Sequence, residues 1–282
     1  MAKNLVIITT IGKHGKIFDN IEYIYKNNQG DYKIALAYNG PLDNAVFFNK
    51  MGKRFPGVEV VKSNTAANIP LAINNVLIRH NEAEYIFILD DDLIIFEKDW
   101  IEKATCIMAR HRNIGVLGLA EDKYIDREKQ SLGYIDEEHK IKICDWAPTI
   151  MCTRRDILAG CGFDPKFYLG HYDIDWQTSV RGKGCIIANY RIKYIHIGGL
   201  STTWLFMNNK KALKEWIYEK ERIELYLKKH KGLLSKEYIE KEAARVNAPV
   251  KEKFLLWDFI KNQVKGVVIS WFKIRLYKLK YG

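Results

Sequence analysis

The stretch EYIFILDDDLIIFEKDW, residues 84–100, places three consecutive carboxylates between two apolar runs. The first run, Tyr85–Leu89, has the length and composition of a buried strand. Asp90, Asp91 and Asp92 follow at its end, where like charges repel each other strongly if water is scarce. A hard divalent cation such as Mg²⁺ or Mn²⁺ prefers oxygen ligands and would relieve that repulsion. We interpret Asp-x-Asp as a clamp for a metal and a diphosphate; the alternative is a solvated turn that caps a following helix.

The residues before this stretch alternate between short apolar runs and segments with helical spacing. The pattern predicts strands over Asn4–Thr10, Tyr32–Tyr38 and Val58–Val61, and helices over 17–27 and Pro70–Arg79. Strands separated by helices favour an α/β fold with a mostly parallel sheet and helices on both faces. Ligands bind beyond the carboxyl ends of the strands in such sheets, so we expect Thr10, Asn39 and the three aspartates to converge.

Composition is that of a globular protein. The chain has 282 residues, of which 48% are hydrophobic and 12% aromatic, and this excludes a disordered chain. The five cysteines are odd in number and contain no Cys-x-x-Cys pair. No signal peptide opens the sequence and no uncharged stretch reaches the roughly 18 residues of a membrane span. We therefore expect reduced, mostly buried cysteines and a cytoplasmic protein.

The basic charge is concentrated near the end of the chain. Of the net charge of +11, residues 251–282 supply +6, from eight basic and two acidic side chains. No recognisable nucleic-acid motif accompanies this charge. We expect no nucleic-acid partner.

A second polar cluster lies in DWAPTIMCTRRDILAGCGFDPKFYLGHYDIDW, residues 145–176. Its run Phe163–Asp175 resembles, without a gap, the pattern F-D-E-x-F-F-x-Y-x-E-D-x-D of glycosyltransferase family 2, whose members have the GT-A fold. Tyr172 stands where that pattern has glutamate, and Gly170 where it has tyrosine. These departures concern the acceptor side more than the chemistry.

The resemblance implies roles for the residues of this cluster. Asp173 corresponds to the base that removes a proton from the acceptor hydroxyl, and Asp175 would help to position the helix that begins there. Trp146, Tyr172 and Asp175 are the residues expected on the acceptor side. The charged segment 121–142 is expected to form a hairpin or a flap over that site.

A third motif is YRIKYIHIGGLSTTW, residues 190–204. Enzymes similar to family 2 place a histidine in such an H-x-G-G-x-S-like run as a further metal ligand, which implies His196. A lone histidine at a strand end is more often structural. With Asp92 and Asp90 it completes the predicted site for Mn²⁺ or Mg²⁺.

The resemblance also implies contacts to the nucleotide sugar. Thr10 corresponds to the threonine of the family's first loop, and Asn39 stands where members have an aspartate or asparagine before glycine. Asn68 lies in a stretch that flanks the nucleotide. Asp90 would contact the ribose or the metal, and Asp91 the adjoining sugar or the backbone. Each of these residue types is also an ordinary turn former.

The domain organisation follows from the span of the resemblance. Residues 1–204 are expected to form the GT-A domain, with a nucleotide-sugar half over about 1–100 and an acceptor half over about 101–204. Residues 205–282 would form a C-terminal helical extension, and 254–281 would be a basic amphipathic segment within it.

The implied function is inverting transfer of one sugar from a nucleotide-diphosphate sugar, with UDP-sugars favoured, to a hydroxyl of a glycan or lipid-linked acceptor. Surface polysaccharide or lipopolysaccharide biosynthesis is the expected setting. If the segment 254–281 binds lipid, the protein would lie at the inner face of the cytoplasmic membrane; otherwise this segment would dock on protein. The oligomeric state stays open.

Two alternatives remain at this point. A sugar-phosphate nucleotidyltransferase would have a similar sheet, but ITTIGKHGK, residues 8–16, is a poor version of the Gly-rich, arginine-containing loop of such enzymes. A non-catalytic glycan- or nucleotide-binding protein could keep the same fold. The retention of Asp90, Asp92, Asp173 and His196 argues against that reading.

Overall fold

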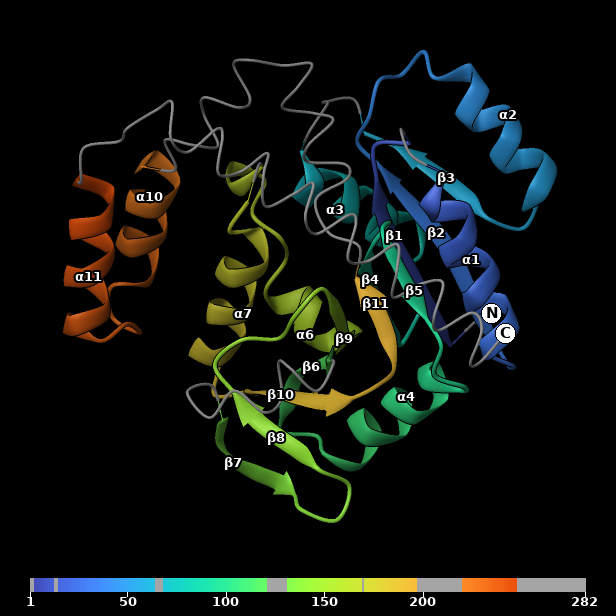
Figure 1. Ribbon diagram of the computed structural model, residues 1–282. Helices are drawn as coiled ribbons and strands as arrows, with labels where there is room; N and C mark the ends of the chain where they lie inside the picture. Colours follow the sequence, from blue (N-terminus) through green and yellow to red (C-terminus); the bar gives the residue numbers. More distant parts are fainter. Residues whose placement is uncertain are drawn as a thin grey trace.

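The computed structural model (Figure 1) describes residues 3–12, 15–63, 68–120, 131–168, 170–196 and 220–247. The predicted amphipathic segment 254–281 and the glycines that follow His196 lie outside these residues.

A mixed sheet forms the centre of the molecule. Its strands are β1 (Asn4–Thr10), β2 (Tyr32–Tyr38), β3 (Glu59–Lys62), β4 (Tyr85–Asp90), β6 (Ile114–Ala120), β7 (Ser131–Asp136), β8 (Ile141–Cys144), β9 (Ile150–Arg154) and β10 (Ile186–Arg191). Among the described residues they form a nine-stranded sheet in the order β3-β2-β1-β4-β9-β6-β10-β8-β7. The first four strands of this order are parallel, whereas β9 runs antiparallel to both β4 and β6. The carboxyl ends of β1, β2 and β4 therefore share one edge.

Helices cover both faces of the sheet, as the sequence predicts. The helices are α1 (Lys16–Asn27), α2 (Ala45–Arg54), α3 (Ile69–Arg79), α4 (Trp100–Arg110), α6 (Arg155–Gly160), the 3₁₀ helix η2 (Pro165–Phe167), α7 (Tyr172–Gly182), α10 (Lys220–His230) and α11 (Lys236–Asn247). Side chains of α1, α2 and α4 join one buried cluster, and those of α3, α6 and α7 join the other. The α/β class with a mostly parallel sheet is confirmed.

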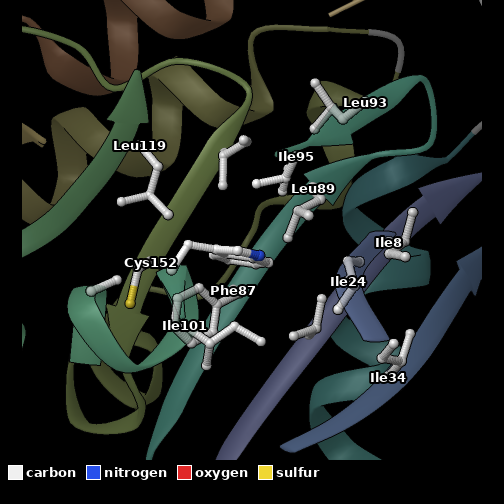
Figure 2. Packing of buried hydrophobic residues seen from close by; sticks show 14 of the residues in the cluster. Ile8, Ile24, Ile34, Phe87, Leu89, Leu93, Ile95, Ile101, Leu119 and Cys152 are labelled. Atoms are coloured by element: carbon white, nitrogen blue, oxygen red, sulfur yellow. The ribbon is translucent and has the colours of Figure 1, made fainter. Parts of the chain in front are cut away.

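The alternation of side chains along β1 explains why a continuous apolar run forms a central strand. Val6 and Ile8 point into the cluster of α1, while Leu5 and Ile7 point into the cluster of α3. All four are fully buried or nearly so, because a strand in the middle of a three-layer fold has no solvent face. Figure 2 shows Ile8 among the packed residues of the first cluster.

A second, small sheet lies beside the main one. It consists of β5 (Leu93–Ile95) and β11 (Tyr194–His196), paired antiparallel with His196 opposite Leu93. The pairing attaches β11 to the residues that directly follow the three aspartates. Their placement side by side is therefore set by backbone hydrogen bonds.

The strands and helices expected in the first hundred residues agree with the structure to within one residue at each bound. The predicted hairpin is β7–β8, at the edge of the sheet, while residues 121–130 lie outside the description. Three of the five free cysteines are buried, as expected. In the part of the chain that the structure describes, no helix is long and apolar enough to cross a membrane.

Candidate functional site

Three strand ends meet at the carboxyl edge of the sheet. Thr9 of β1 lies opposite Asp90 of β4, and Thr10 lies opposite Tyr38 of β2. The backbone N–H of Asn39 donates to the Thr10 carbonyl at 3.0 Å. The predicted convergence of these strand ends is confirmed.

Thr10 and Asp91 contact each other directly. The Thr10 hydroxyl donates to Asp91 Oδ2 at 2.5 Å, and the Gly12 backbone N–H donates to Thr10 Oγ1 at 2.9 Å. Asp91 is only 3% exposed. The Asp91 carboxylate is therefore bound to Thr10 at the start of the first loop.

Asp90, Asp92 and His196 form a cluster suited to a divalent cation. Each offers one ligand atom, and these three atoms lie within 4.8 Å of one another. His196 Nε2 lies 3.1 Å from Asp92 Oδ1 and 3.9 Å from Asp90 Oδ2. Two carboxylate oxygens and one imidazole nitrogen fit a metal such as Mn²⁺, which accepts both donor types. The antiparallel pair β5–β11 supplies this geometry because it sets His196 next to the turn that carries Asp92.

The electrostatics of Asp90 are those of a crowded anionic site. Removal of water from around the carboxyl raises the pKa of Asp90 to about 7. His196 lowers this pKa, while the charges of Asp92, Asp91 and Asp173 raise it further. A carboxylate so placed is stabilised in its charged form by a cation, which is the property that a metal ligand needs.

Asp173 lies in the first turn of α7 and close enough to Asp90 for their charges to interact. Burial raises the pKa of Asp173. The backbone N–H groups of the first turn lower this pKa, and so do the nearby His171 and Trp146. Burial also raises the pKa of Tyr172 well above its ordinary value, so this phenol stays neutral. The candidate base thus faces the metal-binding cluster from the other half of the sheet.

The helix that carries Asp173 begins at a backbone conformation that few residues adopt. His171 precedes α7 with φ of 62°, and Gly170 before it has φ of 156°. Glycine tolerates such angles without steric cost, so Gly170, where the family pattern has tyrosine, suits this turn.

Asn68 makes structural contacts. Its side-chain oxygen accepts a hydrogen bond from Leu71 N at 3.0 Å, which caps α3, and its amide donates to the Pro165 carbonyl at 3.1 Å. Asn39 is nearly buried at the end of β2. Contacts of these two residues with a nucleotide stay predictions.

Comparison with solved structures identifies the fold. The mannosyltransferase PcManGT from Pyrobaculum calidifontis, in complex with GDP-Man and Mn²⁺, is 14% identical; the match covers 98% of this chain and 87% of that one, with a TM-score of 0.55. GalNAc-T7 with UDP, GalNAc and Mn²⁺ is 10% identical over 87% of this chain and 57% of the other, with a TM-score of 0.54. The protein has a GT-A glycosyltransferase fold.

The match with S. aureus TarS is partial. TarS shares the fold with 14% identity and a TM-score of 0.52, over 68% of this chain, which spans 36% of the TarS chain. No model of a protein family matches the sequence, and neither does any curated protein. Membership of glycosyltransferase family 2 therefore stays a prediction, although the glycosyltransferase fold is shown.

Three residues that support the site within this glycosyltransferase fold escape sequence reasoning. Asn20 of α1 is fully buried and donates from its amide to the Asp90 carbonyl at 3.1 Å. Lys229 Nζ and His230 Nε2 of α10 bind Asp175 Oδ2 and Oδ1 at 2.9 and 2.8 Å. The signal for Asn20 is a polar residue on the apolar stripe of a helix, between Ile17 and Ile21.

Asp175 anchors α10 to α7, and its expected place on the acceptor side stays a prediction. It is 1% exposed, and both of its oxygens are engaged by α10. Lys229 also lies 3.0 Å from Asp164 Oδ2, at the start of η2. The extension thereby holds both ends of the segment that leads into Asp173.

Proposed function

We propose that this protein transfers a single sugar, with inversion, from a nucleotide-diphosphate sugar to a hydroxyl group of a glycan or lipid-linked acceptor. The observation that carries the proposal is the meeting of Asp90, Asp92 and His196 with Asp173 across the carboxyl edge of the sheet. The neighbours with GDP-Man or UDP and Mn²⁺ support it at the level of fold.

The donor side of the reaction needs charge neutralisation. A divalent metal, Mn²⁺ or Mg²⁺, supplies positive charge to the departing nucleotide diphosphate when it is bound. Asp90, Asp92 and His196 would hold it, and the hydrogen bond between Thr10 and Asp91 keeps the first loop against this cluster. Asn39, Asn68 and Asp91 are the proposed contacts of the nucleotide sugar.

The acceptor side needs a base. Asp173 would accept the proton of the acceptor hydroxyl as that oxygen attacks the anomeric carbon, and the raised pKa makes its carboxylate a better proton acceptor than an exposed aspartate. Tyr172 and Trp146 would line the acceptor site beside Asp173, because both lie against the Asp173 carboxyl.

Thermal denaturation with UDP, GDP, CMP and dTDP, each with and without Mn²⁺, tests the proposal. One nucleotide should stabilise the protein only with metal, by roughly 2.7 kcal/mol at about a hundredfold excess over its dissociation constant. Asp92→Ala should abolish this shift. If no nucleotide stabilises the protein, the transferase proposal is wrong.

A companion assay separates the nucleotidyltransferase alternative. The protein is incubated with a nucleoside triphosphate and a sugar phosphate, and pyrophosphate release is measured. The proposal expects none, together with release of a nucleoside diphosphate from the matching nucleotide sugar.

The setting of the reaction belongs to the same proposal. We place it in the biosynthesis of a surface polysaccharide or lipopolysaccharide, at the inner face of the cytoplasmic membrane. The basis is the basic amphipathic sequence of 254–281, which suits an anionic lipid surface.

A further inference from the structure

A cavity lies between α7 and the two helices of the C-terminal extension. Its volume is about 420 Å³, within the range of small-molecule pockets. One wall is a face of α7 that includes Ile174 and Arg181, and the other is formed by Tyr226 of α10 and Tyr238 of α11. The three helices stand next to one another in Figure 1.

The cavity adjoins the candidate base. Ile174, on its wall, directly follows Asp173 in the sequence. Trp146, also on its wall, lies against the Asp173 carboxyl and lowers the pKa of that group. The side chain of Trp146 therefore lies between a molecule held in the cavity and the candidate base.

The lining combines aromatic rings with a charged pair. Trp146, Tyr226 and Tyr238 supply the rings, and Arg181 Nη1 lies 2.9 Å from Asp145 Oδ1 at the cavity wall. The side chains of this pair are 35% and 59% exposed, so their remaining donors and acceptors are open to a ligand. A sugar ring presents apolar C–H faces and hydroxyl groups at its rim, which complement rings and charged groups respectively.

We propose that this cavity is an acceptor subsite that binds a sugar ring of an acceptor glycan. The inference rests on the proposed transferase function and assigns its acceptor chemistry. An acyl or polyprenyl chain fits less well, because it would remove water from Arg181 and Asp145 without returning hydrogen bonds.

The subsite is held open by buried polar contacts between its walls. Thr178 of α7 and Tyr226 of α10 share a hydrogen bond of 3.0 Å. Asp175 binds Lys229 and His230 on the same pair of helices. Two such links fix α10 on α7, so the cavity exists before a ligand arrives.

The test is glycan binding by the full chain on a printed array of glycans, with Mn²⁺ and either UDP or GDP present. We expect retention of a related group of glycans, and a loss of affinity of about tenfold in Tyr238→Ala and in Arg181→Met. Tyr25→Ala, at an exposed tyrosine of α1, is the matched control and should bind as the unaltered chain does.

The outcomes separate this inference from the proposed function. If nucleotide and Mn²⁺ stabilise the protein but no glycan on the array binds, or Tyr238→Ala and Arg181→Met bind glycans normally, the subsite assignment is overturned and the donor site stands. If glycans bind through Tyr238 and Arg181 but no nucleotide stabilises the protein, the subsite is supported and the transferase proposal fails.

Discussion

Burial raises the pKa of both Asp173 and the strand-end Asp90, but the two residues have different proposed roles. Asp90 and Asp92 lie with His196 at one cluster, whereas Asp173 lies at the start of a helix that belongs to the acceptor half. In the proposed reaction Asp173 would face the acceptor hydroxyl, while Asp90 and Asp92 would hold the metal. Substitution should therefore separate catalysis from donor binding.

Asp173→Asn should lower the rate of sugar transfer by about 10²- to 10⁴-fold, because an amide cannot accept the proton. The stabilisation by nucleotide and Mn²⁺ should remain. Initial rates of nucleotide release measure the first effect, and thermal denaturation the second. Asp156→Asn, at an exposed carboxylate of α6, is the control; a fully active Asp173→Asn enzyme would refute the assigned base.

Asp90 predicts a pH dependence of stability in the metal-free protein. The pKa of Asp90 is about 7 in the folded chain and about 3.8 in the unfolded chain, so the folded state binds the proton more tightly. Stability contributed by this group is present at low pH and is lost as pH rises from about 4 through 7. Asp90→Asn removes the charge that causes this loss.

We therefore expect Asp90→Asn to raise the melting temperature in EDTA, and to raise it more at pH 8 than at pH 5. Scanning calorimetry at both values measures this difference. Addition of Mn²⁺ should stabilise the unaltered protein and have little effect on the variant. A lower melting temperature for Asp90→Asn at pH 8 would contradict the raised pKa.

Gly40 follows Asn39 at the point where two loops approach each other. A Cβ atom there would lie 2.2 Å from the Ile11 carbonyl oxygen, so Gly40→Ala must displace backbone. We expect a loss of about 1–3 kcal/mol in the free energy of unfolding, measured by urea denaturation. Gly57→Ala has open space around the new atom and should have little effect. Equal losses in both variants would mean that the close approach is unimportant.

At the scale of elements, the buried carboxylate of Asp175 is one of the contacts that hold α10 on α7. Lys229→Met leaves an oxygen of Asp175 without its cation. Breaking a fully buried pair costs about 3–5 kcal/mol, and because a third of the Lys229 side chain is exposed we expect about 1–3 kcal/mol. Lys228→Met, one position earlier on the exposed side of the helix, is the control for urea denaturation. A variant as stable as this control would show that the pair is dispensable.

The elements differ in how far the sequence predicts them. β1, β2 and β4 are continuous apolar runs that end in turn formers, so their type and bounds follow from local pattern. β5 and β11 are three residues each and pair across a long stretch of chain, and no periodicity develops over such a length. The strand β9, which reverses direction inside the sheet, likewise has no local signature.

The site shows the same division. The Asp-x-Asp pair is visible because charge interrupts an apolar run, and Asp173 because a longer pattern surrounds it. Lys229 and His230 stand in a highly charged helix where nothing distinguishes a buried partner from a solvated one. Only the fold, by bringing α10 to α7, selects them.

At the scale of the whole molecule, the basic segment 254–281 predicts attachment to an anionic membrane surface. This segment lies outside the described residues. Removal of residues 254–282 should abolish sedimentation with anionic liposomes, because +5 of the net charge of +11 and the aromatic side chains of this segment leave with it. The truncated chain should keep its nucleotide- and Mn²⁺-dependent stabilisation. Liposome binding that survives the truncation would assign the attachment elsewhere.

The pairing of β5 with β11 has a consequence for synthesis. Asp90 and Asp92 leave the ribosome long before His196, and the strand that positions this histidine is among the last parts of the catalytic region to be made. A nascent or prematurely ended chain thus lacks one of the proposed metal ligands however well its first strands have folded. Under the proposed function, consumption of activated sugar would therefore wait until the residues up to His196, including Asp173, have been translated.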